Sequence, residues 1–133
     1  MTTPGGISPA TREDVSSAMH GEAFAYASYM LFAEEARRSG RREIAELFET
    51  TARTELLEHF AELAALLGLV GATADNLRTA IQGESHEIDV TYPSYAEHAR
   101  AAGDAAVAER LEEIRRDELD HLEAFREALE SVV

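Results

Sequence analysis

The sequence predicts an all-α protein built as a bundle of four helices, and three observations support this prediction. Hydrophobic residues make up 45% of the 133 residues, and Ala and Leu dominate them while β-branched residues are few. Only three prolines occur, and of these only Pro93 falls within a long periodic segment. Apolar residues recur at three- and four-residue steps, as on the buried face of a helix. The length suits one domain with a single core.

Four helical segments are expected, at residues 10–38, 41–67, 74–101 and 104–131, within a domain of residues 10–133 that follows a flexible leader at 1–9. Gly40 separates the first two helices and Gly103 the last two, each where a helix-terminating glycine is expected. Because these turns are short, each pair should form an antiparallel hairpin. Pro93 lacks a backbone donor and should disturb the third helix.

The second half of the chain echoes the first at an offset of 63 residues. Many alanines, glycines and glutamates coincide at this offset, among them Gly40 with Gly103 and Glu55 with Glu118. So many coincidences at one offset predict two related hairpins that face each other about a pseudo-two-fold axis.

The offset of the internal repeat changes by one residue before two matching tyrosines, Tyr29 and Tyr92. Seven positions separate Glu22 from Tyr29, whereas eight separate Glu84 from Tyr92. One extra residue in a helix is most easily absorbed as a π-bulge, and such bulges tend to lie at functional sites.

The composition excludes several classes of function. A net charge of −14 argues against nucleic-acid backbones and anionic membrane surfaces as partners. The absence of Cys excludes disulfides, thiolate zinc sites, iron–sulfur centres and a Cys-ligated electron-transfer iron within this chain. No stretch approaches about 18 apolar residues, and the N-terminus lacks a basic region followed by an apolar one. A cytoplasmic protein without membrane contact is expected.

Acidic residues lie where the apolar stripes of the helices should run. Glu22 comes directly before the run Ala-Phe-Ala-Tyr-Ala, which is almost free of other polarity, and the basic residues gather elsewhere, around residues 37–42. An isolated buried carboxylate must be protonated, paired or bound to a metal. A metal is the simplest explanation for a group of such acids.

The fourth helix carries the most specific pattern, Glu118-Leu-Asp-His121, in which two potential ligands three residues apart share a helix face. The second helix has the related run Glu55-Leu-Leu-Glu58-His59. The third helix offers Glu84 and Glu87, and the first offers Glu22. Each helix thus directs at least one carboxylate to a common level.

Oxygen-rich ligation with imidazole suits iron or manganese and disfavours a structural zinc site. The alternative interpretation is a metal-free helical interaction module whose acids only solvate its surface. The remaining histidines, at 20, 86 and 98, are expected at the surface or beside the ligands. Tyr26, Tyr29 and Tyr92 are expected as core aromatics, whose hydroxyl groups need a partner such as a ligand carboxylate.

These residues resemble the rubrerythrin family over about residues 15–131. The likeness rests on Gly-Glu22 with Tyr29, on Gly-Glu84-Ser-His-Glu87 with Tyr92-Pro93, and on Glu118-Leu-Asp-His121. It implies a ferritin-like bundle with a non-haem diiron site, in which Tyr29 and Tyr92 lie next to the ligands. The implied ligands are Glu22, Glu55, Glu84, Glu87, Glu118 and His121. The activities it suggests are peroxide reduction and, in related members, oxidation of ferrous iron by oxygen.

The second helix departs from the family pattern Glu-x-x-His, because the fourth position is Glu58 and the histidine follows at 59. One residue corresponds to a rotation of about 100° around a helix. Either Glu58 replaces the imidazole and makes the site more anionic, or a local bulge brings His59 in. The chain also lacks a rubredoxin domain, so electrons would come from a separate protein.

The link between the hairpins is short for a ferritin-like bundle, in which the second and third helices run parallel. Closing the path within one bundle needs roughly nine or ten extended residues, whereas the apparent linker 68–73 has six. We therefore expect a domain-swapped homodimer.

The leading functional prediction is an oxidoreductase that reduces hydrogen peroxide or dioxygen at two iron ions, with Glu55 and Glu118 as bridging ligands. Manganese or a mixed pair of metals is compatible with the same ligands. A ferroxidase or iron-handling module, free or inside a larger shell, is the main alternative. An oxygenase on the same scaffold also stays open.

Overall fold

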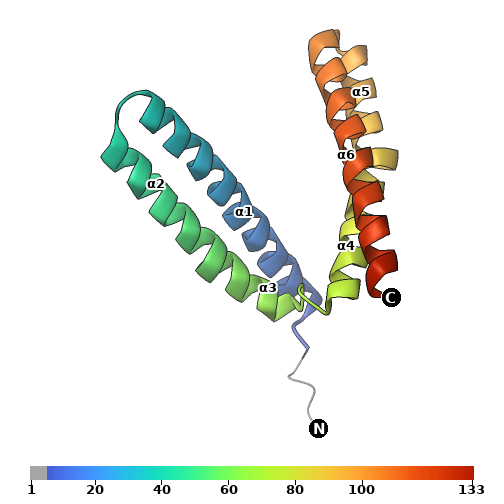
Figure 1. Ribbon diagram of the computed structural model, residues 1–133, viewed down its shortest axis with the longest axis horizontal. Helices are drawn as coiled ribbons and strands as arrows, with labels where there is room; N and C mark the ends of the chain where they lie inside the picture. The colour runs from blue at the N-terminus through green and yellow to red at the C-terminus, as the bar shows by residue number, and fades with distance from the viewer. Residues whose placement is uncertain (1–5) are drawn as a thin grey trace. The chain divides into compact units, whose positions relative to one another are not determined.

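The computed structural model describes residues 6–133, and the regular secondary structure in that range is entirely helical (Figure 1). The elements are α1 (Pro9–Arg38), α2 (Arg42–Thr54), the π-helix η1 (Glu55–Phe60), α3 (Ala61–Leu67), α4 (Thr73–His86), the π-helix η2 (Glu87–Thr91), α5 (Tyr92–Ala101) and α6 (Ala105–Val132). Because α2, η1 and α3 follow one another without a break, as do α4, η2 and α5, the chain forms the four long helices predicted. Of the predicted leader, residues 1–5 lie outside the described range.

The described part of the chain divides into two compact units, with the boundary between residues 70 and 71. In the first unit, α1 packs against α2, η1 and α3; in the second, α6 packs against α4, η2 and α5. Each unit is a helical hairpin, which confirms the predicted pairing of the helices. None of the helices within residues 6–133 combines the length and the apolar character needed to cross a membrane.

The turns of the two hairpins are built alike. Gly40 and Gly103 adopt positive φ angles of 72° and 86°, in the left-handed region that only glycine enters without strain. Their amides donate to the carbonyl oxygens of Arg37 and Arg100, each at 3.0 Å. These equivalent contacts at an offset of 63 confirm the internal repeat.

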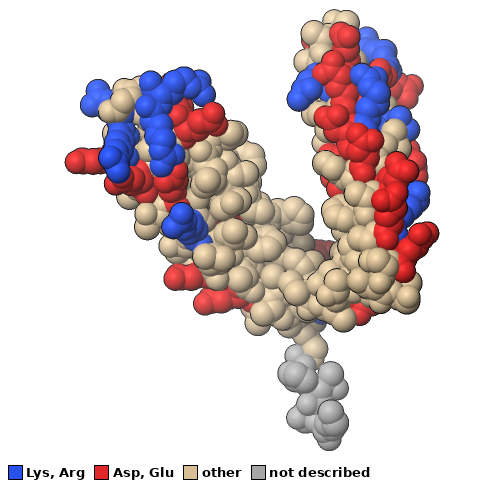
Figure 2. All heavy atoms as spheres, in the orientation of Figure 1, with Lys and Arg blue, Asp and Glu red and all other residues tan. Residues whose placement is uncertain are grey.

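Ion pairs near the turns repeat as well. Arg37 pairs with Glu49 in the first hairpin, and Arg100 pairs with Glu112 in the second. Figure 2 shows charged side chains gathered at the turn end of the first hairpin, whereas much of its visible face further along is uncharged.

Small side chains fill the contact between the two helices of each hairpin. The buried residues are mostly alanines, and the first hairpin has a cluster of Ala33, Ala36 and Ala45 on which Phe48 packs. Many large apolar side chains of both hairpins stay exposed: Phe24, Leu31, Phe32, Ile44, Leu47, Leu57, Leu66, Val90, Tyr95, Val107 and Leu119. Each hairpin therefore carries apolar surface that its own two helices do not cover.

The predicted disturbance at Pro93 is present as η2, which ends two residues before the proline. Pro93 has no N–H to offer the carbonyl groups one turn back. The carbonyl oxygen of Ile88 instead accepts a hydrogen bond from Nε of Arg115, at 2.7 Å. Since Ile88 is buried, this bond from α6 satisfies a carbonyl group that water does not reach.

Candidate metal centre

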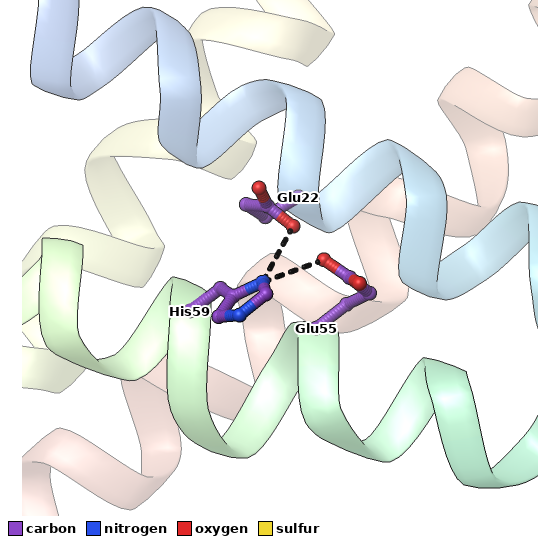
Figure 3. Close-up of side chains that lie close together, drawn as sticks. All are labelled: Glu22, Glu55 and His59. Carbon is purple, nitrogen blue, oxygen red and sulfur yellow. Dashed lines mark hydrogen bonds and ion pairs between the residues drawn. The ribbon is translucent and has the colours of Figure 1, made fainter.

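The first hairpin brings two carboxylates and an imidazole together. Nδ1 of His59 lies 3.0 Å from Oε2 of Glu55 and 3.6 Å from Oε2 of Glu22. Figure 3 shows Glu22 reaching from α1 toward the other two side chains on η1. The Glu55 side chain is 16% exposed and that of Glu22 29%, whereas His59 is half exposed. One potential ligand atom from each residue lies within 4.8 Å of the others, close enough to hold one metal ion.

The second hairpin contains a matching group. Nδ1 of His121 lies 3.2 Å from Oε2 of Glu118 and 3.7 Å from Oε1 of Glu84. The two carboxylates are largely buried and the imidazole is about half exposed. These three residues also offer ligand atoms within 4.8 Å of one another. Each hairpin thus holds two glutamates and one histidine in the same arrangement.

The two π-helices explain how unequal spacings in the sequence give equal groups in space. His59 follows Glu55 by four residues, whereas His121 follows Glu118 by three. The extra residue is taken up in η1, whose wider turn returns the histidine to the face of Glu55. The structure thus places His59 rather than Glu58 beside Glu22 and Glu55, and whether His59 binds a metal stays a prediction.

The other one-residue change in the offset of the repeat is absorbed by the second π-helix, η2. Between Glu84 and Tyr92 the chain has one residue more than between Glu22 and Tyr29, and η2 lies within that interval. The predicted π-bulge in the third helix is confirmed.

Two predicted ligands lie outside these groups. Glu58 is exposed on η1, one residue away from the histidine that faces Glu22 and Glu55. Glu87 is partly buried at the first position of η2, and its negative charge is one of those that raise the pKa of Tyr92. Burial and the nearby charges of Glu87, Glu118 and Glu84 raise the pKa of Tyr92.

The two tyrosines expected near the ligands differ in their surroundings. Tyr92 lies among the acids of the second group, as described above. The ring of Tyr29 packs against those of Phe48 and Phe32, with centroids 5.9 and 6.3 Å apart. The histidines at 20, 86 and 98 are exposed, as expected.

The two acids of the second group have pKa values shifted in opposite directions. Hydrogen bonding with Glu118 and burial raise the pKa of Glu84 to about 7. The hydrogen bonds from Glu84 and from His121 lower the pKa of Glu118, and the bond to Glu118 raises the pKa of His121. Two adjacent buried carboxylates disfavour a second negative charge, so one retains its proton.

The second group also leaves a polar atom unsatisfied. Oε2 of Glu84 is buried and has no hydrogen-bond partner among the described residues. A cation at this position would displace the proton that a raised pKa favours on Glu84, neutralise the carboxylates and satisfy this oxygen. The donor set and its unsatisfied oxygen therefore fit a divalent metal ion.

Arg115 is a residue that sequence reasoning missed. It supports η2, on which Glu87 lies, through the carbonyl oxygen of Ile88. The only signal in the sequence was Pro93, whose missing N–H requires some other donor for the preceding turn, and nothing in the sequence identifies Arg115 as that donor.

Comparison with known proteins gives the family of the chain. The model of the rubrerythrin family matches residues 13–129. The chain belongs to the rubrerythrin family. Rubrerythrin of Porphyromonas gingivalis is 33% identical to it over 84% of this chain and 62% of that protein. The putative rubrerythrin of Methanocaldococcus jannaschii is 31% identical over 92% and 70%, respectively. The chain thus spans about two thirds of the length of these relatives.

The all-α, ferritin-like four-helix class predicted from the sequence agrees with this membership. A solved structure of nigerythrin, in its fully reduced, all-ferrous state, aligns with 99% of this rubrerythrin-family chain and 72% of its own. The identity is 27% and the TM-score is 0.46.

Proposed function

We propose that this protein is a non-haem diiron oxidoreductase that reduces hydrogen peroxide, or dioxygen, with electrons from a separate donor protein. The observation that carries the proposal is the pair of matching groups, each with two glutamates and one histidine, in a rubrerythrin-family chain. Carboxylate-rich ligation with imidazole suits iron, and also manganese or a mixed pair. The proposed ligands are Glu22, Glu55, His59, Glu84, Glu118 and His121, with Glu87 joining them on metal binding.

Each glutamate and histidine has a distinct role in this proposal. Glu55 and Glu118, the more buried acids that contact the histidines of their own hairpins, are proposed to bridge the metal ions. Glu22 and Glu84 reach the site from α1 and α4 and are proposed to act as terminal ligands. Bound ferrous iron would supply the electrons that cleave the O–O bond.

The protein's own residues manage protons. With its pKa raised to about 7, Glu84 is protonated in part of the metal-free protein near neutral pH and must release that proton when a cation binds. Tyr92 keeps its phenol proton, since burial and the surrounding acids raise its pKa, so its hydroxyl group can donate a hydrogen bond toward the site.

The position of His59 supports peroxidase chemistry over ferroxidase chemistry. Replacement of the second imidazole by Glu58 would have added a negative charge, which favours oxidation of the ferrous pair. With His59 beside Glu55 and Glu22, the ligand set keeps one imidazole in each hairpin. We therefore place peroxide ahead of dioxygen as the oxidant. A cytoplasmic location is part of the same proposal.

The proposal is tested by anaerobic ferrous titration of the metal-stripped protein, followed by peroxide or air in separate samples. We expect saturation at about two irons per chain and a faster absorbance change with peroxide than with air. Glu118→Gln should lose most of this binding, while Glu58→Gln serves as the matched control on an exposed glutamate.

Each other result points to a different function. Faster reaction with air and release of ferric iron would indicate a ferroxidase. The absence of saturable binding would leave a metal-free helical protein.

A further inference from the structure

The linker between the hairpins is fixed to the end of α3. Gly68 adopts a left-handed conformation with φ of 65°. Its amide donates to the carbonyl of Ala65 at 3.2 Å, and the amide of Leu69 donates to that of Ala64 at 3.1 Å. These bonds cap the helix and satisfy its last carbonyl groups. The first two linker residues therefore belong structurally to the first hairpin.

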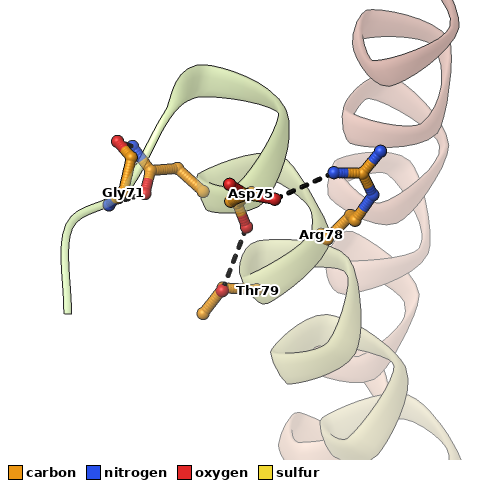
Figure 4. A network of polar contacts seen from close by, with 5 residues as sticks. Gly71, Asp75, Arg78 and Thr79 are labelled. Atoms are coloured by element: carbon orange, nitrogen blue, oxygen red, sulfur yellow. Dashed lines mark hydrogen bonds and ion pairs between the residues drawn. The ribbon is translucent and has the colours of Figure 1, made fainter. Parts of the chain in front are cut away.

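The other end of the linker is fixed to the start of α4. The amide of Gly71 donates to Oδ1 of Asn76 at 2.7 Å, and Nδ2 of Asn76 donates back to the carbonyl of Gly71 at 3.0 Å. Figure 4 shows Gly71 beside the first turn of α4, where Asp75 accepts hydrogen bonds from Arg78 and Thr79. Only Val70 lies between the two anchored segments.

This linker cannot make the long crossover of a ferritin-like bundle, in which the second and third helices run parallel. Leu67 lies twelve residues beyond Glu55, and Thr73 lies eleven before Glu84. With Glu55 and Glu84 at one level, the crossover must span about 34 Å along the bundle. The six steps from Leu67 to Thr73 reach about 22 Å when fully extended, even after both caps are broken.

We propose, on the basis of the diiron function above, that each metal centre is shared between two copies of this chain. The first hairpin of one copy, with Glu22 and Glu55, pairs with the second hairpin of the other, with Glu84 and Glu118. The active protein is then a homodimer with two bundles and two centres, and neither centre is complete within one chain.

The exposed apolar surface supports a second copy as the partner of each hairpin. In the first hairpin, Phe24 is 76% and Leu57 68% exposed; in the second, Val90 is 52% and Val107 54% exposed. Only alanines and a few larger residues are buried within either hairpin, so a full core requires another hairpin. A copy of the same chain supplies that hairpin, with its half of the ligands.

The proposal is tested first by lengthening the linker. Ten Gly and Ser residues inserted after Val70 make the crossover possible within one chain. We expect the wild-type protein to sediment at twice the chain mass and the lengthened protein at the chain mass, with the same iron per chain. The matched control carries the same insertion between Gly103 and Asp104, which leaves the crossover short, and should stay dimeric.

A wild-type monomer, or a lengthened protein that stays dimeric, would overturn the proposal. A monomer would indicate an up-and-down bundle, for which a short link suffices. Because mass is measured without iron, loss of iron binding with the expected masses would refute the diiron function alone.

A complementation experiment tests the sharing of ligands directly. Glu55→Gln removes a ligand from the first hairpin and Glu118→Gln removes one from the second. When the two variants carry different tags and are refolded together, doubly tagged dimers contain one centre with both substitutions and one with neither. We expect such dimers to bind about half the iron of the wild type, while each variant alone binds little. Iron near zero in the doubly tagged dimers would refute the exchange of hairpins.

Discussion

Deletion of Leu57 is the perturbation that most directly tests the role of η1. The run Glu55-Leu-Leu-Glu58-His59 would become Glu-Leu-Glu-His, with three residues from the first glutamate to the histidine, as in Glu118-Leu-Asp-His121. If η1 serves only to absorb one extra residue, its removal should restore a regular α-helix and leave the histidine facing Glu22. Leu57 is 68% exposed within its own chain, so its loss removes little packing between η1 and α1.

The magnitude follows from helix geometry. A deletion in a regular α-helix rotates the two parts by about 100°, and a side-chain tip about 5 Å from the axis moves by about 8 Å. Such a displacement removes a ligand from a site whose three ligand atoms lie within 4.8 Å of one another. In η1 the deletion instead cancels an existing irregularity, so the expected displacement is small.

The assay is an anaerobic measurement of the affinity of the metal-stripped protein for ferrous iron. Deletion of Leu57 should keep the iron affinity within about tenfold of wild type. Deletion of Leu47, another exposed leucine but in regular α2, should lower it by well over 100-fold, since loss of supporting contacts alone costs 10- to about 100-fold. The reasoning would be refuted if both deletions abolished binding equally, or if His59→Gln left the affinity unchanged.

Three further predictions concern pH, buried backbone and the turns. The folded-state pKa of Glu84 lies above its usual 4.5, at about 7, so its proton stabilises the metal-free fold at low pH. Raising the pH from about 5 to 8 should lower the unfolding free energy by at most about 3 kcal/mol, and the lowered pKa of Glu118 acts below about pH 5, outside this range. Glu84→Gln should remove most of this dependence in a thermal melt. Ferrous affinity should rise over the same range as the proton leaves. Arg115→Met should cost about 1–3 kcal/mol, because the buried carbonyl of Ile88 loses its donor, and chemical denaturation would show it. Gly103→Ala should lower the melting temperature by about 4 °C, for a cost of about 1 kcal/mol at positive φ, whereas Ala102→Gly, at a normal φ, should not reproduce it.

The sequence predicted the helices because their signals are local. Gly40 and Gly103 end the helices within one residue of the predicted positions, since a left-handed turn requires glycine. The acids at 22, 55, 84 and 118 were identified because a carboxylate on an apolar stripe needs a partner, whatever the details of packing.

The choice between Glu58 and His59 could not be predicted from the same signals. Both residues are plausible ligands, and the local sequence of η1 does not distinguish an α-helix from a π-helix. Arg115 escaped prediction for a similar reason, because its acceptor at Ile88 is 27 residues away and only the packing of α6 brings them together.

The two π-helices also bear on how the halves of this chain diverged. Around the turns the offset between equivalent residues is 63 throughout, whereas it is 62 from Glu22 to Glu84 and from His59 to His121. One residue was therefore gained or lost in each half, between Glu55 and His59 in the first and between Glu84 and Tyr92 in the second. A helix that widens by one local turn accommodates such a change without rotating the rest of the hairpin. The chain could thus alter the spacing of its ligands in single-residue steps, while its turns and ion pairs kept their original register.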